Sequence, residues 1–325
     1  MLKYVLKKLL RMFVLLFLVC LISFFVVVNS PIDTLQAQLG TSAMSMSPEQ
    51  KAQIIAYWGL DKPQAERFMG WFTSVIRGDF GISMIYHQPV WNLIKTNFVN
   101  TFALMLVAWV LSGAIGFLLG IAAAVYQGSW LDKTITVYCM ILASSPKFWL
   151  GLLVLMFFAG YLHWFPIGMI NPIGALSAET DLMTKIRHMV LPALTLSFVS
   201  VANIAMQSRS KLIEVLGSDY VLFARANKKS KRRIVVQHGL RNILLPVVTL
   251  QFLSFSELFG GAVFIEQIFS YPGLAGMVQE AGLKGDIALL LGIVLISAVW
   301  VFVGNLIADV LYAVIDPRIK ESWGV

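Results

Sequence analysis

The sequence predicts an all-α integral membrane protein with six transmembrane helices. Hydrophobic residues make up 58% of the 325-residue chain and charged residues only 13%, whereas soluble domains have about 25% charged residues. The mean hydropathy is +0.78, and apolar residues gather into six segments long enough to cross a bilayer as helices. The net charge of +8 comes from basic residues beside apolar segments, which indicates membrane topology and not nucleic-acid binding.

The first apolar segment runs from Phe13 to Val28 and follows a basic N-terminus. Together with Leu9 and Leu10 it has about 20 residues, the length that a membrane-spanning helix needs. A cleaved secretory signal is the alternative, but the run exceeds the usual length of about 7 to 15 residues and lacks a small-x-small cleavage site. We therefore predict that residues 1–28 form a cytoplasmic N-terminus and an uncleaved first transmembrane helix.

Residues 29–97 are polar with balanced charge, which predicts a small helical subdomain on the external side. Ser47 can cap a helix that has Pro48 in its first turn, and Gln50 is placed to complete a capping box. A second helix is expected to carry its large apolar residues on one face. These residues are Phe68, Trp71, Phe72 and Val75.

Residues 98–325 hold five further apolar segments and are predicted to form a five-helix transmembrane core, with a cytoplasmic loop at 207–242. The segments cover approximately residues 98–125, 135–162, 189–206, 243–269 and 287–314. In the first of them, Gly113, Gly116 and Gly120 are spaced by three and four residues. This spacing puts small residues on one face of a helix and predicts close contact with a neighbouring helix.

Basic residues dominate residues 207–242, between the fourth and fifth apolar segments. They are Arg209, Lys211, Arg225, Lys228, Lys229, Lys231, Arg232, Arg233 and Arg241, against Glu214 and Asp219. Because cytoplasmic loops carry an excess of Lys and Arg, this loop is predicted to be cytoplasmic. Six crossings from a cytoplasmic N-terminus place the C-terminal tail, including residues 316–320, on the same side.

Within this loop, residues 217–246 fit two short amphipathic helices. The first is predicted from Asp219 to about Asn227, and the second begins after Ser230, a favourable N-cap residue. One face of the first helix is expected to hold Tyr220, Phe223 and Ala224. A compact pair of helices is therefore expected between the apolar segments.

The same stretch carries a set of residues with a recognisable pattern. They are Asp219-Tyr220-Val221, Ala224-Arg225-Ala226, Arg232-Arg233, His238, Leu240-Arg241-Asn242 and Leu245-Pro246. This pattern resembles the EAA motif in permease subunits of ATP-binding cassette importers, in the dipeptide, oligopeptide and nickel branch. The resemblance continues through Gly260-Gly261-Ala262-Val263, Glu266 and Pro272-Gly273-Leu274 and covers nearly the whole chain.

The resemblance implies a permease subunit of a bacterial uptake system in the inner or plasma membrane, surrounded by lipids. The implied partners are a second similar permease, two cytoplasmic ATP-binding cassette subunits and an external solute-binding protein. The implied solute is a peptide, nickel, a metal chelate or another small solute. The residues expected to couple the chain to an ATPase are Asp219, Tyr220, Phe223, Ala224, Arg225, Ala226, Arg232 and Arg233.

One position departs from the family pattern. The family usually has glycine where this chain has Lys228, and glycine would end the first short helix in a left-handed conformation. Asn227 tolerates that conformation better than most residues. It is expected to substitute for the missing glycine.

The sequence lacks the residues of a catalytic site. No Gly-x-x-x-x-Gly-Lys-Ser/Thr phosphate loop occurs, and no segment holds paired carboxylates, a nucleophile with a base, or metal-ligand spacing. The chain is therefore predicted not to be an enzyme and to bind no cofactor or metal. ATP and Mg²⁺ are expected on the separate ATPase subunits.

Lys147 and Glu257 each place a charge within an apolar segment, where it costs roughly 2.5 to 3.5 kcal/mol at the bilayer centre. The two side chains could pair with each other, or they could line a translocation path and meet a charged solute. Alternatively, Lys147 could extend to a membrane face while Glu257 stays deep. An ion-gradient-driven carrier that uses these two residues is the alternative to an ATP-driven importer.

Overall fold

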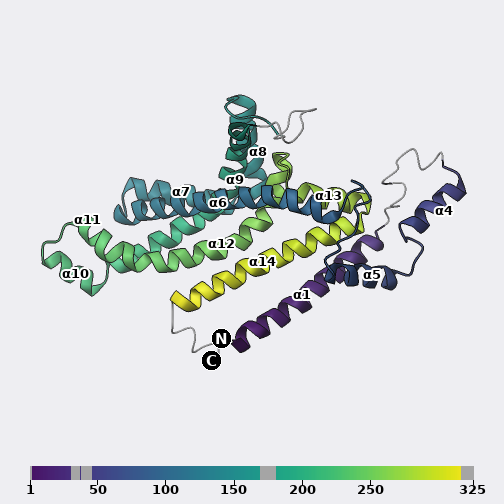
Figure 1. Ribbon diagram of the computed structural model, residues 1–325. Coiled ribbons are helices and arrows are strands. Elements are labelled where there is room, and N and C mark those ends of the chain that lie inside the picture. The colour runs from purple at the N-terminus through teal and green to yellow at the C-terminus, as the bar shows by residue number, and fades with distance from the viewer. Residues whose placement is uncertain (1, 31–36, 38–45, 169–180, 316–325) are drawn as a thin grey trace. The chain divides into compact units, whose positions relative to one another are not determined.

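The computed structural model describes residues 2–30, 37, 46–168 and 181–315, which are nearly all helical and contain no strand (Figure 1). The predicted C-terminal tail at 316–320 lies outside the described residues. In chain order the helices are α1 (Leu2–Val28), α4 (Pro48–Tyr57), α5 (Gln64–Ile76), α6 (Val90–Val125), α7 (Trp130–Ser144), α8 (Lys147–Val154), the π-helical η1 (Leu155–Tyr161), α9 (Leu182–Leu216), α10 (Asp219–Ala226), α11 (Lys231–Ile234), the π-helical η2 (Val235–Leu240), α12 (Arg241–Ile268), α13 (Leu274–Lys284) and α14 (Ile287–Ile315).

Four helices are each long and apolar enough to cross a membrane. They include residues Lys8–Val28, Val90–Val125, Leu182–Leu216 and Ile287–Ile307. Two bent helix pairs also qualify if each pair is one span, Trp130–Ser144 with Lys147–Tyr161 and Lys231–Phe255 with Glu257–Ile268. The four helices and two pairs correspond to the six predicted apolar segments and confirm the all-α membrane fold.

The second predicted core segment, residues 135–162, is not one continuous helix. It breaks at Ser145 and Pro146, and the helices on either side meet at an angle of 111°. Proline lacks the backbone N–H that a continuing helix needs and disfavours helical backbone in the preceding residue. Ser145 accordingly has extended backbone angles, φ −83° and ψ 136°.

The chain divides into two compact units. One unit comprises Met1–Asn100 and Gly273–Phe302, and the other comprises Thr101–Pro272 and Val303–Val325. In the first unit, the predicted capping box of α4 is confirmed, with Ser47 and Gln50 bonded reciprocally through side chain and backbone. The apolar face of α5 packs on α1 through an aromatic cluster of Phe17, Phe24, Phe68 and Phe72.

A buried carboxylate organises the rest of the first unit. Asp286, which is 0% exposed, accepts hydrogen bonds from Ser83 Oγ at 2.6 Å and from the Ile85 N–H at 3.2 Å. Its other oxygen accepts from the Leu289 N–H at 3.1 Å and so caps the first turn of α14. One side chain thereby joins the loop before α6 to the start of α14.

In the second unit, small residues bring α6 against α9. A Cβ on Gly116 would lie 2.9 Å from Ile204 Cβ, and a Cβ on Gly120 would lie 2.5 Å from the Ala205 carbonyl oxygen. These distances are closer than side chains allow, so the predicted close helix contact is confirmed. Gly113 instead faces the Gln251 side chain of α12.

A buried ion pair links α7 to α9. Arg209 donates from Nε and Nη2 to the two carboxylate oxygens of Asp132, at 2.6 and 2.8 Å. The Gly128 N–H donates to the same carboxylate at 2.9 Å. Since bidentate pairs with extra hydrogen bonds fix geometry strongly, this contact holds the start of α7 against the last third of α9.

Candidate functional site: an exposed loop and a polar cavity

The helix α10 has an inner face that packs within the loop. Val221 and Ala224 are 0% and 4% exposed and contact Ile234 of α11. The two residues lie one turn apart and therefore point the same way. Tyr220 also lies one turn from Ala224, but it is exposed, as is Phe223. The prediction that Ala224 joins their surface is therefore wrong, because Ala224 is buried against α11.

The outer side of α10 is open and carries three large apolar residues among polar ones. Tyr220, Leu222 and Phe223 are 47%, 51% and 72% exposed. Leu222 was not predicted as part of this face, although three large apolar residues in an eight-residue helix signal it. The other exposed residues of the predicted coupling set are Asp219, Arg225, Ala226, Arg232 and Arg233.

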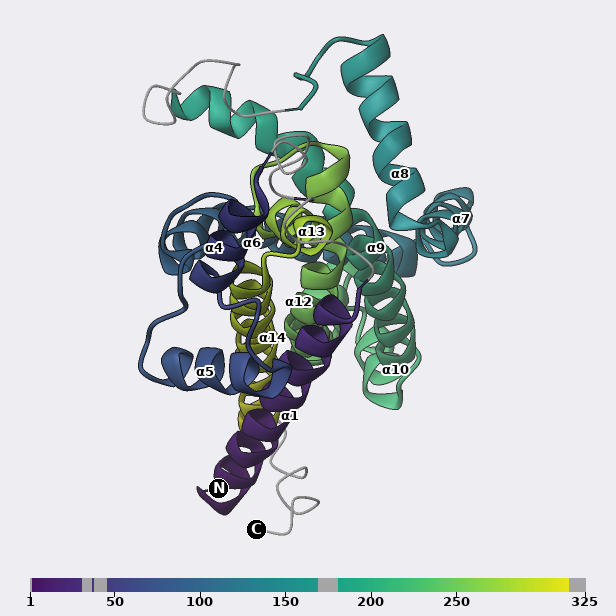
Figure 2. The same cartoon turned by 90° about the vertical axis from the view of Figure 1, so that its right-hand side faces the viewer.

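Two of the predicted coupling residues also hold the loop together. Arg225 donates from Nη2 to the Leu216 carbonyl oxygen at 3.2 Å and so satisfies the C-terminal end of α9. Asn242 donates to Tyr220 Oη at 3.3 Å, and the Tyr220 ring lies 6.0 Å from the His238 ring. α10 is thus fixed to both α9 and the start of α12, and Figures 1 and 2 show it at the end of α9.

The left-handed turn after α10 falls on Lys228. Its φ is 54°, whereas Asn227 has φ −78° and ψ 20°. The prediction that Asn227 takes the left-handed conformation is therefore wrong. The lysine itself adopts the conformation that a glycine in the family position would adopt.

Lys231 connects the loop to α6, a role that the sequence analysis missed. Its Nζ donates to the Val125 carbonyl oxygen at the end of α6 and lies 5.5 Å from the centroid of the Tyr126 ring. The lysine thus combines a helix C-terminal contact with a cation–π contact. Since 106 residues separate Lys231 from Val125, no local pattern points to this contact.

Lys147 and Glu257 lie beside each other between α8 and α12. Lys147 Nζ is 3.4 Å from Glu257 Oε1 and 3.5 Å from the Glu257 carbonyl oxygen. The Lys147 side chain is 27% exposed and the Glu257 side chain 45% exposed. This is the geometry of the paired alternative, and it leaves much of the carboxylate uncovered.

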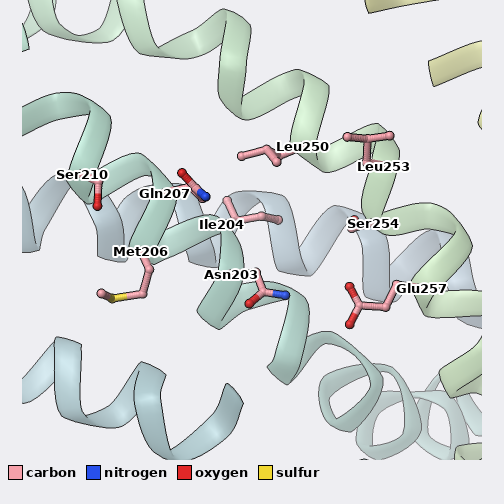
Figure 3. A pocket seen from close by; sticks show the side chains of 9 residues that line it. All are labelled: Asn203, Ile204, Met206, Gln207, Ser210, Leu250, Leu253, Ser254 and Glu257. Carbon is pink, nitrogen blue, oxygen red and sulfur yellow. The ribbon is translucent and has the colours of Figure 1, made fainter. Parts of the chain in front are cut away.

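Glu257 also lines a cavity of about 390 Å³ between α9 and α12 (Figure 3). Figure 3 shows side chains of both helices around this space, with the Glu257 carboxylate near Asn203 at one end and Gln207 and Ser210 farther along α9. The remaining lining residues are Ile204, Met206, Leu250, Leu253 and Ser254. The cavity therefore has apolar walls and a polar edge.

Asn203, Gln207 and Ser210 form a polar stripe on α9. Their spacing of four and three residues places them on one face, and all three are exposed within the described structure. Amide and hydroxyl side chains in a membrane-spanning helix find hydrogen-bond partners on neighbouring helices or in water, because lipid tails offer none. Asn203 lies near the end of the apolar part of α9, while Gln207 and Ser210 lie where the predicted cytoplasmic loop begins. The stripe is therefore suited to a water-filled cavity at the cytoplasmic end of the helix.

Two family models match almost the whole chain. One is described as "Binding-protein-dependent transport system inner membrane component" and matches residues 116–321. The other is described as the N-terminal part of a binding-protein-dependent transport system membrane component and matches residues 1–105. The interval between the two matches, residues 106–115, lies within α6.

Curated relatives are similar over the same extent. The oligopeptide transport system permease protein AppB of Bacillus subtilis is 35% identical over 98% of this chain and 99% of its own. The dipeptide permease protein DppB of Escherichia coli K12 is 35% identical over 85% and 87%. The glutathione permease protein GsiC of Salmonella typhimurium is 35% identical over 98% and 99%.

A solved structure shares the fold. In an inward-facing structure of the MetNI methionine ABC transporter, one chain superposes with a TM-score of 0.55 and 17% identity. The match covers 69% of this chain and 96% of that chain. None of these comparisons supports an ion-gradient-driven carrier. The chain belongs to the family of binding-protein-dependent transport system inner membrane components, as a multi-pass permease subunit of an ABC importer.

Proposed function

We propose that this chain is one of two similar permease subunits of an ATP-driven bacterial importer for peptides or a peptide-like solute. The relatives named for oligopeptide, dipeptide and glutathione transport support this solute class over nickel or a metal chelate. Two ABC ATPases bind ATP and Mg²⁺ on the cytoplasmic side, and an external solute-binding protein delivers the solute. The N-terminus, the loop at 207–242 and the C-terminus lie in the cytoplasm, and residues 29–97 lie outside.

The exposed apolar face of α10 carries the proposal that the loop docks on an ATPase. Phe223 is the most exposed of its three large residues, at 72%, while the inner face and Arg225 hold the helix in place. A side chain of this kind gains roughly 1.5 to 3 kcal/mol when it is buried against a partner. Arg232 and Arg233 stay exposed beside the face and can fix its orientation electrostatically.

The polar stripe supports the proposal that α9 and α12 line the translocation path. Asn203, Gln207 and Ser210 have no side-chain hydrogen bond to another described residue and are free to meet water or solute. In this arrangement the second permease supplies the opposite wall. Lys147 and Glu257 then lie at the edge of the path.

The docking proposal is tested with Phe223→Ala in the complex reconstituted with its ATPases and solute-binding protein. We expect the variant to insert normally but to lose solute-stimulated ATP hydrolysis or to release the ATPase, because an apolar anchor is gone. Phe25→Ala is the matched control, since Phe25 is 44% exposed on α1, outside the loop. Wild-type coupling and ATPase retention in Phe223→Ala would refute docking through this face.

A further inference from the structure

The edge of the cavity carries a negative charge without a matching positive charge among the described lining residues. Among the described residues that line the cavity, Glu257 is the one that carries a charge. Its carboxylate is 45% exposed, while the Lys147 side chain is 27% exposed and is absent from the cavity lining. A solute in the cavity therefore meets the negative partner of the pair first.

The close approach of α8 to α12 explains why Lys147 pairs with the Glu257 carboxylate but does not line the cavity. A Cβ on Gly261 would lie 3.3 Å from Lys147 Cδ and 3.4 Å from its Nζ. The lysine therefore lies across the backbone of α12 at a glycine, and its Nζ reaches both the carbonyl and Oε1 of Glu257. The lysine stabilises the carboxylate from one side without covering it.

The Glu257 carboxylate can accept a hydrogen bond from a further donor. An ionised carboxylate has about four acceptor positions, and Glu257 receives one side-chain contact within the described structure, at 3.4 Å. Hydrogen bonds between charged groups strengthen away from bulk water. The neighbouring amides of Asn203 and Gln207 can accept further hydrogen bonds from the same ligand.

The geometry points to Glu257 as a binding site for cationic side chains in the translocation path, where its carboxylate pairs with the protonated side-chain amine of a lysine in a passing peptide. This inference depends on the proposed importer function and adds a selectivity to it. The cavity volume of about 390 Å³ falls within the range of roughly 300 to 1,000 Å³ that small-molecule sites have. An acidic side chain at the same place would face the carboxylate and be disfavoured.

The test measures uptake by the complete complex in proteoliposomes, with trialanine, Ala-Lys-Ala and Ala-Glu-Ala as probes. Glu257→Gln should lower the Ala-Lys-Ala to trialanine ratio of kcat/KM about tenfold relative to the wild type, as expected for the loss of one charged hydrogen bond. The same solute-binding protein is present in every arm, so its own preference cancels in this comparison. Glu214→Gln, the same charge change on α9 outside the cavity, should leave the ratio unchanged.

A second variant distinguishes the loss of the Glu257 carboxylate from misfolding caused by an unpaired lysine. The double change Lys147→Met and Glu257→Gln removes both charges and leaves no unpaired lysine, and it should lose the same cation preference. A wild-type ratio in both the single and the double variant would overturn the binding site for cationic side chains while leaving the importer intact. Failure of the wild-type complex to take up any of the three peptides would instead contradict the proposed peptide import.

Discussion

Lys228 shows how a single residue can conflict with the turn that it occupies. A non-glycine residue with φ near +54° bears a conformational cost of roughly 1 to 2 kcal/mol. The substitution Lys228→Gly removes this cost, although glycine also adds entropy to the unfolded chain. We expect a net gain of up to about 1 kcal/mol, observed as slower amide hydrogen exchange across α10.

The neighbouring residue provides the control for this prediction. Asn227 has φ −78°, so Asn227→Gly relieves no strain, adds flexibility and removes the hydrogen bond that Asn227 Nδ2 donates to the Phe223 carbonyl oxygen at 3.0 Å. It should leave exchange in α10 unchanged or faster. If Lys228→Gly also accelerated exchange, the lysine would be contributing contacts that outweigh its backbone strain.

Residues whose role depends on a short stretch of chain were predicted well. The capping box at Ser47 and Gln50 depends on neighbours within three residues. Ser230 occupies the predicted N-cap position of α11, but its side chain makes no capping hydrogen bond. Which face of α10 is buried depends instead on α11, and the placement of Ala224 was therefore missed. The pairing of Lys147 with Glu257 spans 110 residues, which is why the sequence left three alternatives open.

At the scale of the helices, α6 packs closely against α9 in the second unit. A Cβ on Gly120 would lie 2.5 Å from the Ala205 carbonyl oxygen and 2.6 Å from Ser208 Cβ. Gly120→Ala must therefore push the two backbones apart, and we expect it to destabilise the chain by about 1 to 3 kcal/mol. Thermal unfolding of the purified chain in mild detergent measures the loss.

Gly260→Ala is the matched control on α12. A Cβ at that position meets no atom within 4 Å, and alanine favours helix by about 1 kcal/mol over glycine. The variant should unfold at the wild-type temperature or above. Equal melting temperatures for Gly120→Ala and the wild type would show that α6 and α9 are farther apart in the membrane.

The helices themselves were predicted from apolar length, but their breaks were not. Six apolar segments correspond to four long helices and two bent pairs. Pro146 predicts the break between α7 and α8, which meet at 111°. No proline lies at the bend of 48° within α12. The length of an apolar segment indicates how many residues enter the bilayer. It carries little information on the direction in which the helix then runs.

At the scale of the whole molecule, the orientation in the membrane is open to direct measurement. Tyr57 of α4 is 79% exposed, and Lys229 is exposed in the loop after α10. We expect a membrane-impermeant maleimide to label Tyr57→Cys in intact cells and Lys229→Cys only after permeabilisation. The native Cys20 and Cys139 are buried and should add little background.

The same labelling experiment can also contradict the proposed topology. Labelling of Lys229→Cys in intact cells would place the basic loop outside, against the excess of Lys and Arg in cytoplasmic loops. It would also separate α10 from any cytoplasmic ATPase. Equal labelling of both positions before and after permeabilisation would rule out the proposed topology.

The hydrogen bond from Ser83 to Asp286 has a consequence for how the chain is made. The two residues are 203 positions apart, and a ribosome adds roughly 5 to 20 residues per second. The loop that precedes α6 therefore waits on the order of 10 to 40 s for its partner to be synthesised. During that interval the serine and the Ile85 N–H remain available to water or chaperones, so the first unit is completed only when the last apolar segment emerges.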